Sequence, residues 1–411
     1  MPREENSKCY EMILNYNCNA RCSFCSQGSF DKSLNAGFKQ AAAAIYAAYR
    51  GGYRRLGLTG GEPLVRPDIV KVIALARSVG FKFIRVQTNG IKLSDAAFCR
   101  RLAAAGLTFC KFSLTSDRPS EHDRLVGVPG AWEKAARGVR SMRALKVRVG
   151  NNILVSRANY RRLPEITGAL LKMGVTSIVI IYPAYIGAMA DNIKALGVSL
   201  GECEPYFDAA VRIMERAGLG GEMLFLNVPP CFLKGRESMA IGLGLFNTVV
   251  TDPLGASTNL DQTADAAKVR APACRRCRLK DRCAGVDKNY ARNFGFAGFK
   301  PIRSATQAAP APAAPSAPAP SAPPAARAAG REPQVFSDNE LCLLEILKRR
   351  GEATTAQVLA MARDIVLCRD CSDGNSVLNA AQSLDIKGFV ESVLARGRYY
   401  WRLKKNPGGR P

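Results

Sequence analysis

The sequence predicts an α/β protein built around a parallel β-sheet. Short β-rich runs alternate with helical stretches between residues 10 and 182. Successive β-rich runs lie roughly 25–40 residues apart, which leaves room for a crossover helix between parallel strands. Such crossovers are right-handed. The pattern leaves two forms open, a doubly wound open sheet and a curved partial barrel.

Each predicted element follows from its own residues. The strands are rich in β-branched and aromatic side chains, whereas the helices repeat apolar residues every three or four positions. The predicted strands are Glu11–Tyr16, Arg55–Thr59, Phe81–Gln87, Phe109–Leu114, Val147–Val155 and Ser177–Tyr182, with Glu222–Val228 as one further strand. The predicted helices are Gly37–Tyr49, Pro67–Val79, Asp95–Ala105, Ala131–Leu145 and Leu163–Met173.

The 411 residues exceed one typical domain, and the composition changes along the chain. A large α/β part precedes a small Cys- and Arg-rich module. A run of Ala, Pro and Ser then follows, which buries too little apolar surface to fold. The predicted domains are residues 1–215 for the α/β core, 216–303 for the module, 304–334 for a disordered linker, 335–404 for a C-terminal domain and 405–411 for a flexible tail.

The C-terminal domain is predicted to be winged-helix-like. Ser337 and Glu340 have the spacing of a capping box before its first helix. The sequence indicates helices at Leu341–Lys348, Val358–Ala362 and Ser376–Leu384, followed by a hairpin of Phe389–Leu394 and Tyr399–Leu403. The domain is nearly balanced in charge, which weakens the case that it binds DNA phosphates.

Composition narrows the class of protein. His122 is the only histidine, which excludes histidine triads and His-rich metal sites. No apolar run is long enough for a membrane span, and the polar start Met1–Lys8 is unlike a signal peptide. We therefore expect a cytoplasmic protein. In that compartment, the fourteen cysteines are more often metal ligands than disulfides.

Three cysteines directly after the first predicted strand form the most informative motif. Cys18, Cys22 and Cys25 have the spacing C-x3-C-x2-C. Three thiolates on one tight loop can ligate three irons of a 4Fe–4S cluster, which leaves the fourth iron open for a substrate or cofactor. Zinc would require a fourth ligand, and no histidine lies close in sequence. The loop also follows a strand, where parallel α/β folds place their active sites.

Two further features accompany this motif: Phe24 lies before its third cysteine, and the turn Gly60-Gly61-Glu62-Pro63 follows the second strand. Together they resemble the radical S-adenosylmethionine (SAM) superfamily. The resemblance covers residues 10 to about 185 and implies a partial (β/α)6 TIM-like barrel. It implies that Cys18, Cys22 and Cys25 bind a 4Fe–4S cluster whose open iron holds SAM. Reductive cleavage of SAM would then yield a 5′-deoxyadenosyl radical that abstracts a substrate hydrogen atom.

The same resemblance implies a set of cofactor contacts. Gly60 and Gly61 match the backbone turn that bonds the cofactor's amino group, and Glu62 either sets that turn or accepts from the ammonium. Further contacts are implied for Asn89 in the turn Thr88-Asn89-Gly90, for Ser113 on the fourth strand and for Asn152 on the fifth. For these three residues a capping or turn role is the alternative.

One stretch departs from the family pattern. A peptide-modifying subgroup has Ser-x-Asp-Gly followed by His-Asp, but here Thr115 and Ser116 stand in place of Asp-Gly, before His122 and Asp123. We therefore expect His122 to cap or pack.

A second cysteine set comprises Cys274, Cys277 and Cys283, in the spacing C-x2-C-x5-C, with Cys231 upstream as a fourth member. This spacing resembles the SPASM domain, which carries auxiliary clusters. Asn247 and Asp287, however, stand where the full pattern would have cysteine. The resemblance implies one auxiliary 4Fe–4S cluster, fully ligated by the four cysteines. A four-cysteine zinc site is the alternative.

The remaining cysteines lack the spacing of a ligand set. Cys9, Cys99, Cys110 and Cys203 are predicted to be buried thiols. Cys368 and Cys371 have C-x2-C spacing but no second pair.

Together these features predict a radical SAM oxidoreductase or maturase. Its expected partners are a peptide, protein or small-molecule substrate and a low-potential electron donor such as ferredoxin or flavodoxin. The net charge of +25 favours one alternative, radical modification of RNA or DNA. A second alternative is a non-enzymatic iron–sulfur regulator that binds DNA through residues 335–404. The intact turn Gly60–Pro63 argues against the regulator, because a sensor needs no cofactor pocket.

Overall fold

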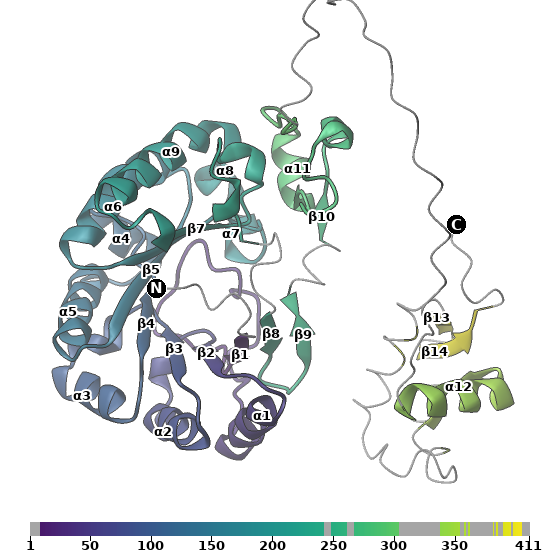
Figure 1. Cartoon of the computed structure of the whole chain (residues 1–411). Helices are drawn as coiled ribbons and strands as arrows, with labels where there is room; N and C mark the ends of the chain where they lie inside the picture. The colour runs from purple at the N-terminus through teal and green to yellow at the C-terminus, as the bar shows by residue number, and fades with distance from the viewer. Residues whose placement is uncertain are drawn as a thin grey trace, which may run out of the picture. The chain divides into compact units, whose positions relative to one another are not determined.

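The chain forms two compact units, residues 1–313 and residues 314–411 (Figure 1). The computed structural model describes residues 9–241, 248–260, 267–303, 338–353, 357–358, 361, 381, 384, 389–395 and 398–404. The predicted linker, the tail and the pair Cys368 and Cys371 lie outside the described residues.

A nine-stranded curled sheet organises the first unit, in the order β7-β6-β5-β4-β3-β2-β1-β8-β9 (Figure 1). Strands β1 to β7 are parallel neighbours, β8 adds parallel to β1, and β9 pairs antiparallel with β8. The strands are β1 (Cys9–Ile13), β2 (Arg55–Thr59), β3 (Phe83–Gln87), β4 (Phe109–Phe112), β5 (Arg148–Leu154), β6 (Ser177–Ile181), β7 (Met223–Leu226), β8 (Thr248–Thr251) and β9 (Ser257–Asn259). This arrangement confirms the predicted partial barrel.

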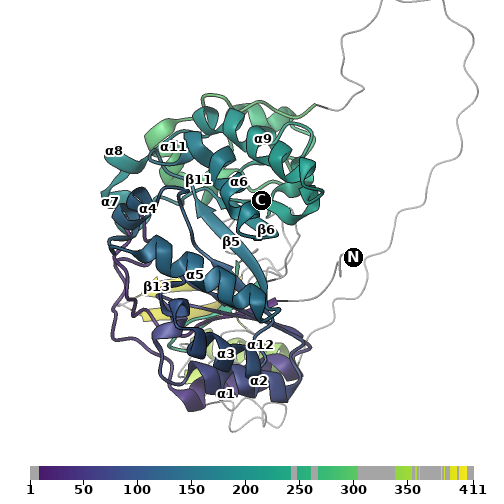
Figure 2. The ribbon, with the colours of Figure 1, turned by 90° about the vertical axis from the view of Figure 1, so that its left-hand side faces the viewer.

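Helices cover the outer face of the curled sheet (Figure 2). Those between the strands are α1 (Phe38–Arg50), α2 (Ile69–Val79), α3 (Ala96–Ala104), α4 (Pro119–Val126), α5 (Ala131–Ala144), α6 (Leu163–Lys172), α7 (Ala188–Asp191), α8 (Ile193–Leu196) and α9 (Leu200–Arg216). After the sheet come a small ladder of β10 (Lys268–Val269) and β11 (Val286–Asp287), and helix α11 (Lys288–Phe294).

The sheet extends beyond the six strands that the pattern predicted. The further predicted strand is β7, and it forms one edge of the barrel sheet, while β8 and β9 extend the other edge. The predicted boundary between residues 215 and 216 therefore falls just before a strand of the same sheet. Helix α9 was not predicted, because Pro205 lies inside it and proline ordinarily interrupts a helix.

The two faces of the sheet differ in chemistry because successive side chains on a strand point to opposite sides. The outer-face residues, such as Met12, Leu58 and Phe112, join one continuous apolar core with the helices. The inner, concave face carries polar side chains that include Glu11, Arg85 and Lys111. The core thus lies between sheet and helices, and the concave face is left for function.

The second unit contains a helix and a three-stranded antiparallel sheet. Its elements are α12 (Asp338–Arg350), β12 (Glu352–Ala353), β13 (Val390–Ala395) and β14 (Arg398–Leu403), with the strand order β12-β14-β13. The predicted hairpin corresponds to β13 and β14. The other two predicted helices lie largely outside the described residues, so the winged-helix-like fold remains a prediction. Among the described residues of both units, no helix is both long and apolar enough to cross a membrane.

Candidate functional site

The cysteine loop lies at the carboxyl edge of the sheet, directly after β1. On one side, the backbone N–H groups of Arg21 and Ser23 donate to the carbonyls of Val126 (3.0 Å) and Leu125 (2.9 Å) at the end of α4. On the other side, the N–H of Ala188 in α7 donates to the carbonyl of Cys25 at 3.0 Å. Phe24 packs against the main core. Two helices far apart in sequence, α4 and α7, therefore hold the loop that carries the thiols.

The two glycines after β2 allow the chain before Cys18 to approach closely. A Cβ atom on Gly60 would lie 2.4 Å from the carbonyl oxygen of Asn15, and one on Gly61 would lie 2.3 Å from that of Asn17. The N–H of Gly61 donates to Asn15 at 2.7 Å, and that of Glu62 donates to Asn17 at 2.8 Å. Glycine is thus required at these positions to fasten the start of the cysteine loop to β2.

The buried carboxylate of Glu62 joins the turns after β2 and β3. Its Oε1 accepts hydrogen bonds from the Leu64 N–H (3.0 Å) and the Thr88 hydroxyl (2.7 Å), and its Oε2 accepts from the Asn89 N–H (2.7 Å). Burial raises the pKa of Glu62 to about 7, although these three donors favour the charged form. Glu62 therefore sets the turn, which is one of its two predicted roles.

Asn89 contacts the cysteine loop directly. Its side-chain amide donates to Oδ1 of Asn19 at 2.8 Å and lies 3.8 Å from the sulfur of Cys18. Its own Oδ1 accepts from the N–H of Ile91 at 3.0 Å. Asn89 therefore has a turn role and also places an N–H donor beside a predicted cluster ligand.

The thiols of the loop are close enough to influence one another. Burial, together with the neighbouring Cys18 and Cys25 thiols, raises the pKa of Cys22 to about 12. Burial is also the main reason that the pKa of Cys18 is raised. A bound metal centre would compensate this cost, because cationic metals stabilise thiolates and displace their protons. The all-sulfur donor set and the adjacent Asn89 amide fit an iron–sulfur cluster.

Ser113 and Asn152 lie on the concave side of the neighbouring strands, but the side chain that links β4 to β5 is Asn151. Asn151 accepts from the Leu114 N–H and donates to the Leu114 carbonyl, each at 2.9 Å. Asn152 is 8% exposed, and within the described part of the chain its side chain has no hydrogen bond. Asn151 is therefore a structural residue, whereas Asn152 faces the concave side.

His122 is a packing residue. It is buried in α4, where its Nδ1 lies 3.3 Å from the N–H of Thr115 and 3.2 Å from the Thr115 hydroxyl. Burial lowers the pKa of His122 to about 4, so the ring is neutral at physiological pH. The hydroxyl of Ser116 donates to Glu121 at 2.6 Å. Thr115 and Ser116 thus fix the turn after β4.

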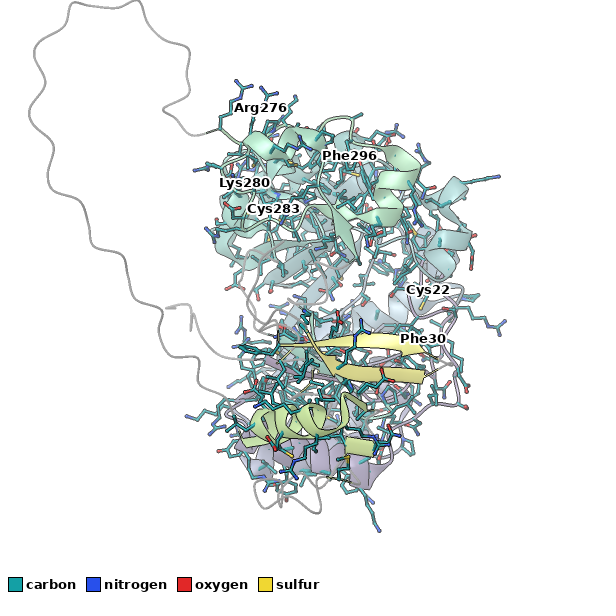
Figure 3. The ribbon with its side chains drawn as sticks, turned by 90° about the vertical axis from the view of Figure 1, so that its right-hand side faces the viewer. Cys22, Phe30, Arg276, Lys280, Cys283 and Phe296 are labelled. Atoms are coloured by element: carbon teal, nitrogen blue, oxygen red, sulfur yellow. The ribbon has the colours of Figure 1, made fainter. Side chains whose placement is uncertain are left out.

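The second cysteine set surrounds a recess in the module after β7. Cys231, Cys274, Cys277 and Cys283 all line this recess, together with apolar residues such as Phe299 and Ile302. Burial and the nearby Cys283 and Cys274 thiols raise the pKa of Cys231 to about 12. Figure 3 shows Cys283 in this module and Cys22 in the barrel, so the two cysteine sets form separate sites.

The metal that each cysteine set could hold is inferred from its donor types and not from a preformed ligand geometry. Across the described ranges of the chain, no three His, Cys, Asp or Glu side chains meet the spacing of ligands to one metal ion. The donor chemistry of the second set, four cysteines around one recess, is that of a fully ligated cluster or a zinc site.

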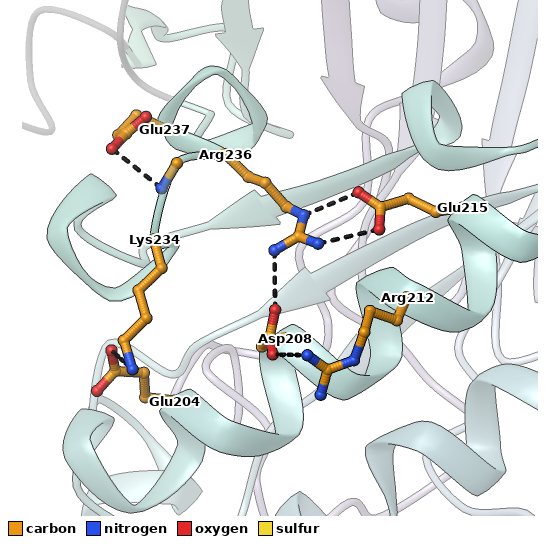
Figure 4. A network of polar contacts seen from close by, with 8 residues as sticks. Glu204, Asp208, Arg212, Glu215, Lys234, Arg236 and Glu237 are labelled. Atoms are coloured by element: carbon orange, nitrogen blue, oxygen red, sulfur yellow. Dashed lines mark hydrogen bonds and ion pairs between the residues drawn. The ribbon is translucent and has the colours of Figure 1, made fainter.

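An ion-pair network fixes the segment that carries Cys231 (Figure 4). The guanidinium of Arg236 bonds Asp208 and Glu215 of α9, each at 2.8 Å. Lys234 pairs with Glu204, also in α9, at 3.0 Å. Because α9 packs against the barrel, this network places Cys231 relative to the sheet. Neither α9 nor the network was predicted, since its partners lie more than twenty residues apart.

The four cysteines predicted to be buried thiols are buried. Cys99, Cys110 and Cys203 are fully enclosed, and Cys9 is 8% exposed. All four are free thiols. They lie outside both cysteine sets and serve as matched positions for control substitutions.

The fold and the site together define a curled parallel sheet with a three-cysteine loop at its carboxyl edge. Residues 12–170 match the family model described as the Radical SAM superfamily. An iron–sulfur cluster and SAM are the cofactors of that superfamily.

Two curated relatives have different activities. The PqqA peptide cyclase of Gluconobacter oxydans is 26% identical over 208 residues, which is 50% of this chain and 58% of that protein. The AdoMet-dependent heme synthase of Nitratidesulfovibrio vulgaris is 26% identical over 162 residues, 39% of this chain and 44% of that protein. The matches thus span about half the length of these relatives.

Solved structures share the fold over more of the chain. SuiB of Streptococcus suis, bound to its precursor peptide SuiA, aligns with a TM-score of 0.55 and 12% identity, covering 74% of this chain and 76% of SuiB. SuiB bound to SAM aligns similarly, with a TM-score of 0.54 and 11% identity. At these identities the likeness shows the fold.

We predict that Glu62 makes stability depend on pH. Because its folded pKa of about 7 lies above its ordinary value of 4.5, the folded protein keeps a proton that the unfolded chain releases. Stability should therefore fall as pH rises from roughly 4.5 to 7, by about 3 kcal/mol at 1.36 kcal/mol per pKa unit. Glu62→Gln should remove this component, measured as the difference in free energy of unfolding between the two proteins at each pH.

His122 acts in the opposite direction. Its lowered pKa of about 4 means that the unfolded chain binds the extra proton, so its contribution to stability increases as pH rises from roughly 4 to 6.5. The comparison with Glu62→Gln isolates Glu62, because both proteins retain His122. A stability difference that stays constant across this pH range would contradict the assignment.

Proposed function

We propose that this chain is a radical SAM enzyme that binds a 4Fe–4S cluster through Cys18, Cys22 and Cys25. The observation that carries the proposal is the fastening of the cysteine loop to the Gly60–Glu62 turn and to Asn89, at the carboxyl edge of a curled parallel sheet. When bound, the cluster supplies the electron that cleaves SAM to methionine and a 5′-deoxyadenosyl radical.

The chain's own residues prepare this site. The three thiols give up their protons on binding the cluster, and the Asn89 amide donates toward the sulfur of Cys18. The proposed cofactor contacts are the backbone of the turn Gly60–Glu62 and the side chains of Asn89, Ser113 and Asn152. Glu62 holds the turns after β2 and β3 in place before the cofactor arrives, which lowers the cost of ordering on binding.

The proposed substrate is a peptide or protein, whose modification would be a maturation or an oxidation. The relationship to a PqqA peptide cyclase supports this class. The equally distant heme synthase supports a small-molecule substrate as the alternative. The fold likeness to SuiB is compatible with either substrate class.

Cys22→Ala should abolish SAM cleavage. The anaerobically reconstituted wild type, reduced with dithionite, should form 5′-deoxyadenosine, whereas the variant should form at least a hundredfold less because it lacks one of three cluster ligands. Chromatography of 5′-deoxyadenosine measures both. Cys99→Ala, which removes a buried thiol outside the loop, is the control and should retain cleavage. A wild type with intact iron but no cleavage would instead favour a non-enzymatic regulator.

We further propose that Cys231, Cys274, Cys277 and Cys283 bind an auxiliary 4Fe–4S cluster. Their arrangement around one recess supports this proposal, and the spacing of the last three resembles a SPASM domain. With four cysteine ligands no iron would be open to substrate, so electron transfer or structural support would be its task.

Cys283→Ala should lose about four iron atoms per chain and no zinc, because each 4Fe–4S cluster holds four irons. Elemental analysis of anaerobically purified protein measures both metals, and Cys203→Ala is the matched control. A wild type that carries one zinc per chain, lost in Cys283→Ala, would replace the auxiliary cluster with a zinc site.

A basic surface around the second cysteine set suits an acidic electron carrier such as ferredoxin or flavodoxin. Exposed cations surround the recess, while the exposed acid beside it is Asp281. Figure 3 shows Arg276 and Lys280 near Cys283. The surface, which we name the basic rim, comprises Arg270, Arg275, Arg276, Arg278, Lys280 and Lys300. Complementary charge mainly accelerates association, and salt screens the effect.

Reversing charge on the basic rim should therefore slow reduction by a protein donor. Arg275→Glu with Arg276→Glu should lower flavodoxin-driven formation of 5′-deoxyadenosine roughly tenfold or more at low salt. Dithionite is a small reductant that needs no docking surface, so dithionite-driven cleavage should remain. Lys71→Glu with Lys82→Glu, on the opposite part of the unit, is the control of equal charge change. An equal loss with both reductants would contradict the docking role.

A further inference from the structure

Lys111 is a buried lysine on the concave face of the barrel. Lys111 in β4 is 5% exposed, and within the described part of the chain its Nζ has neither a hydrogen bond nor an ion pair. Its strand neighbours Cys110 and Phe112 join the outer core, so Lys111 points to the opposite, concave side. The nearest aromatic contact of Nζ is the ring of Phe109, at 5.7 Å from its centroid.

Glu222, the acid whose charge acts on Lys111, and Glu11 of the concave face each lie beside another cation. Glu11 forms an ion pair with Arg85, and Glu222 lies 3.9 Å from Arg148. Burial, with a further contribution from Arg85, lowers the pKa of Lys111 to about 7. A buried charge ordinarily requires a partner, since the cost of removing it from water is several kcal/mol. Among the described residues no carboxylate pairs with Lys111 to offset this cost, and its contact is with the Phe109 ring.

The register of the sheet places Lys111 next to the proposed cofactor contacts. Lys111 pairs with Gln87 of β3 and Gly150 of β5. Two residues further toward the carboxyl edge, on the same face, come Asn89, Ser113 and Asn152. The ammonium therefore lies one layer of side chains below the place where the cofactor is proposed to bind.

We propose that Lys111 binds an anionic group of the substrate, a carboxylate or a phosphate, and so holds the substrate beneath the cofactor. This inference rests on the proposed radical SAM function. The partner of the Lys111 ammonium would be this anionic group, which is present only when the substrate is bound. Charge-assisted hydrogen bonds of this kind are short and strong in a site shielded from water.

Two small anions serve as probes for the two kinds of anionic group that Lys111 could bind. Glutarate carries carboxylates and inorganic phosphate represents a phosphoryl group. Calorimetric titration of the reconstituted full chain, with SAM present, should show binding of one of them. In Lys111→Met the dissociation constant should rise at least tenfold. Lys172→Met, which removes an exposed lysine at the end of α6, should leave it unchanged.

The titration distinguishes a carboxylate from a phosphate as the group that Lys111 binds. Binding of glutarate alone assigns a carboxylate, and binding of phosphate alone assigns a phosphoryl group. If neither anion distinguishes the wild type from Lys111→Met, or if Lys172→Met loses binding equally, the inference is wrong. Lys111→Met should fold, because replacing an unpaired buried charge with an apolar side chain is often neutral or stabilising.

A measurement on the wild type avoids any doubt about variant folding. Pyridoxal 5′-phosphate condenses with a lysine amine, with loss of water, and borohydride reduces the resulting imine to a stable secondary amine. Peptide mass spectrometry should find the label on Lys111, reduced at least fivefold by the anion that binds. Absence of label on Lys111 beside labelled exposed lysines would overturn the inference. Neither measurement requires SAM cleavage, so the cleavage assay on the wild type tests the proposed function separately.

Discussion

The site depends on one buried carboxylate. Glu62 accepts from a backbone N–H in its own turn and from a hydroxyl and a backbone N–H in the turn after β3. The preceding glycines bring the same turn against the start of the cysteine loop. Two loops and two strands thus share a single hydrogen-bonded centre, and a shift in any of them would move Cys18 and Asn89 together. Such over-determined turns preorganise a site.

The division of the sheet into two faces explains where the function can lie. Apolar residues on the outer face supply the packing that stabilises the barrel, and burial of this area is the main favourable contribution to folding. The concave face is therefore free to carry Glu11, Arg85 and Lys111, residues that destabilise a core unless they are paired. Glu11 and Arg85 form an ion pair with each other, and Lys111 is the residue that we propose binds a ligand.

The two cysteine sets are separate in space but belong to one framework. The chain leaves the barrel after β7 at one edge of the sheet and returns as β8 at the other edge. Cys231 lies on this path, where Arg236 and Lys234 attach it to α9. The module is thereby coupled to the sheet at both ends, which gives the second set a defined place relative to the first.

Sequence alone determined what depends on neighbouring residues. The cysteine spacing, the GGEP and TNG turns and the bounds of β2 all lie within a few positions of one another, so propensity, periodicity and motif spacing reveal them. Only the tertiary structure decided that β7 and β8 flank the parallel sheet. It also decided that Asn151 rather than Asn152 links β4 to β5. The close approach of Asn15 and Asn17 to Gly60 and Gly61 likewise appears only in the folded chain. A lysine within the apolar strand FCKF was visible in the sequence, but its lack of a partner was not. These features depend on contacts between residues far apart in the chain, and such contacts exist only once the sheet has curled and its neighbours are in place.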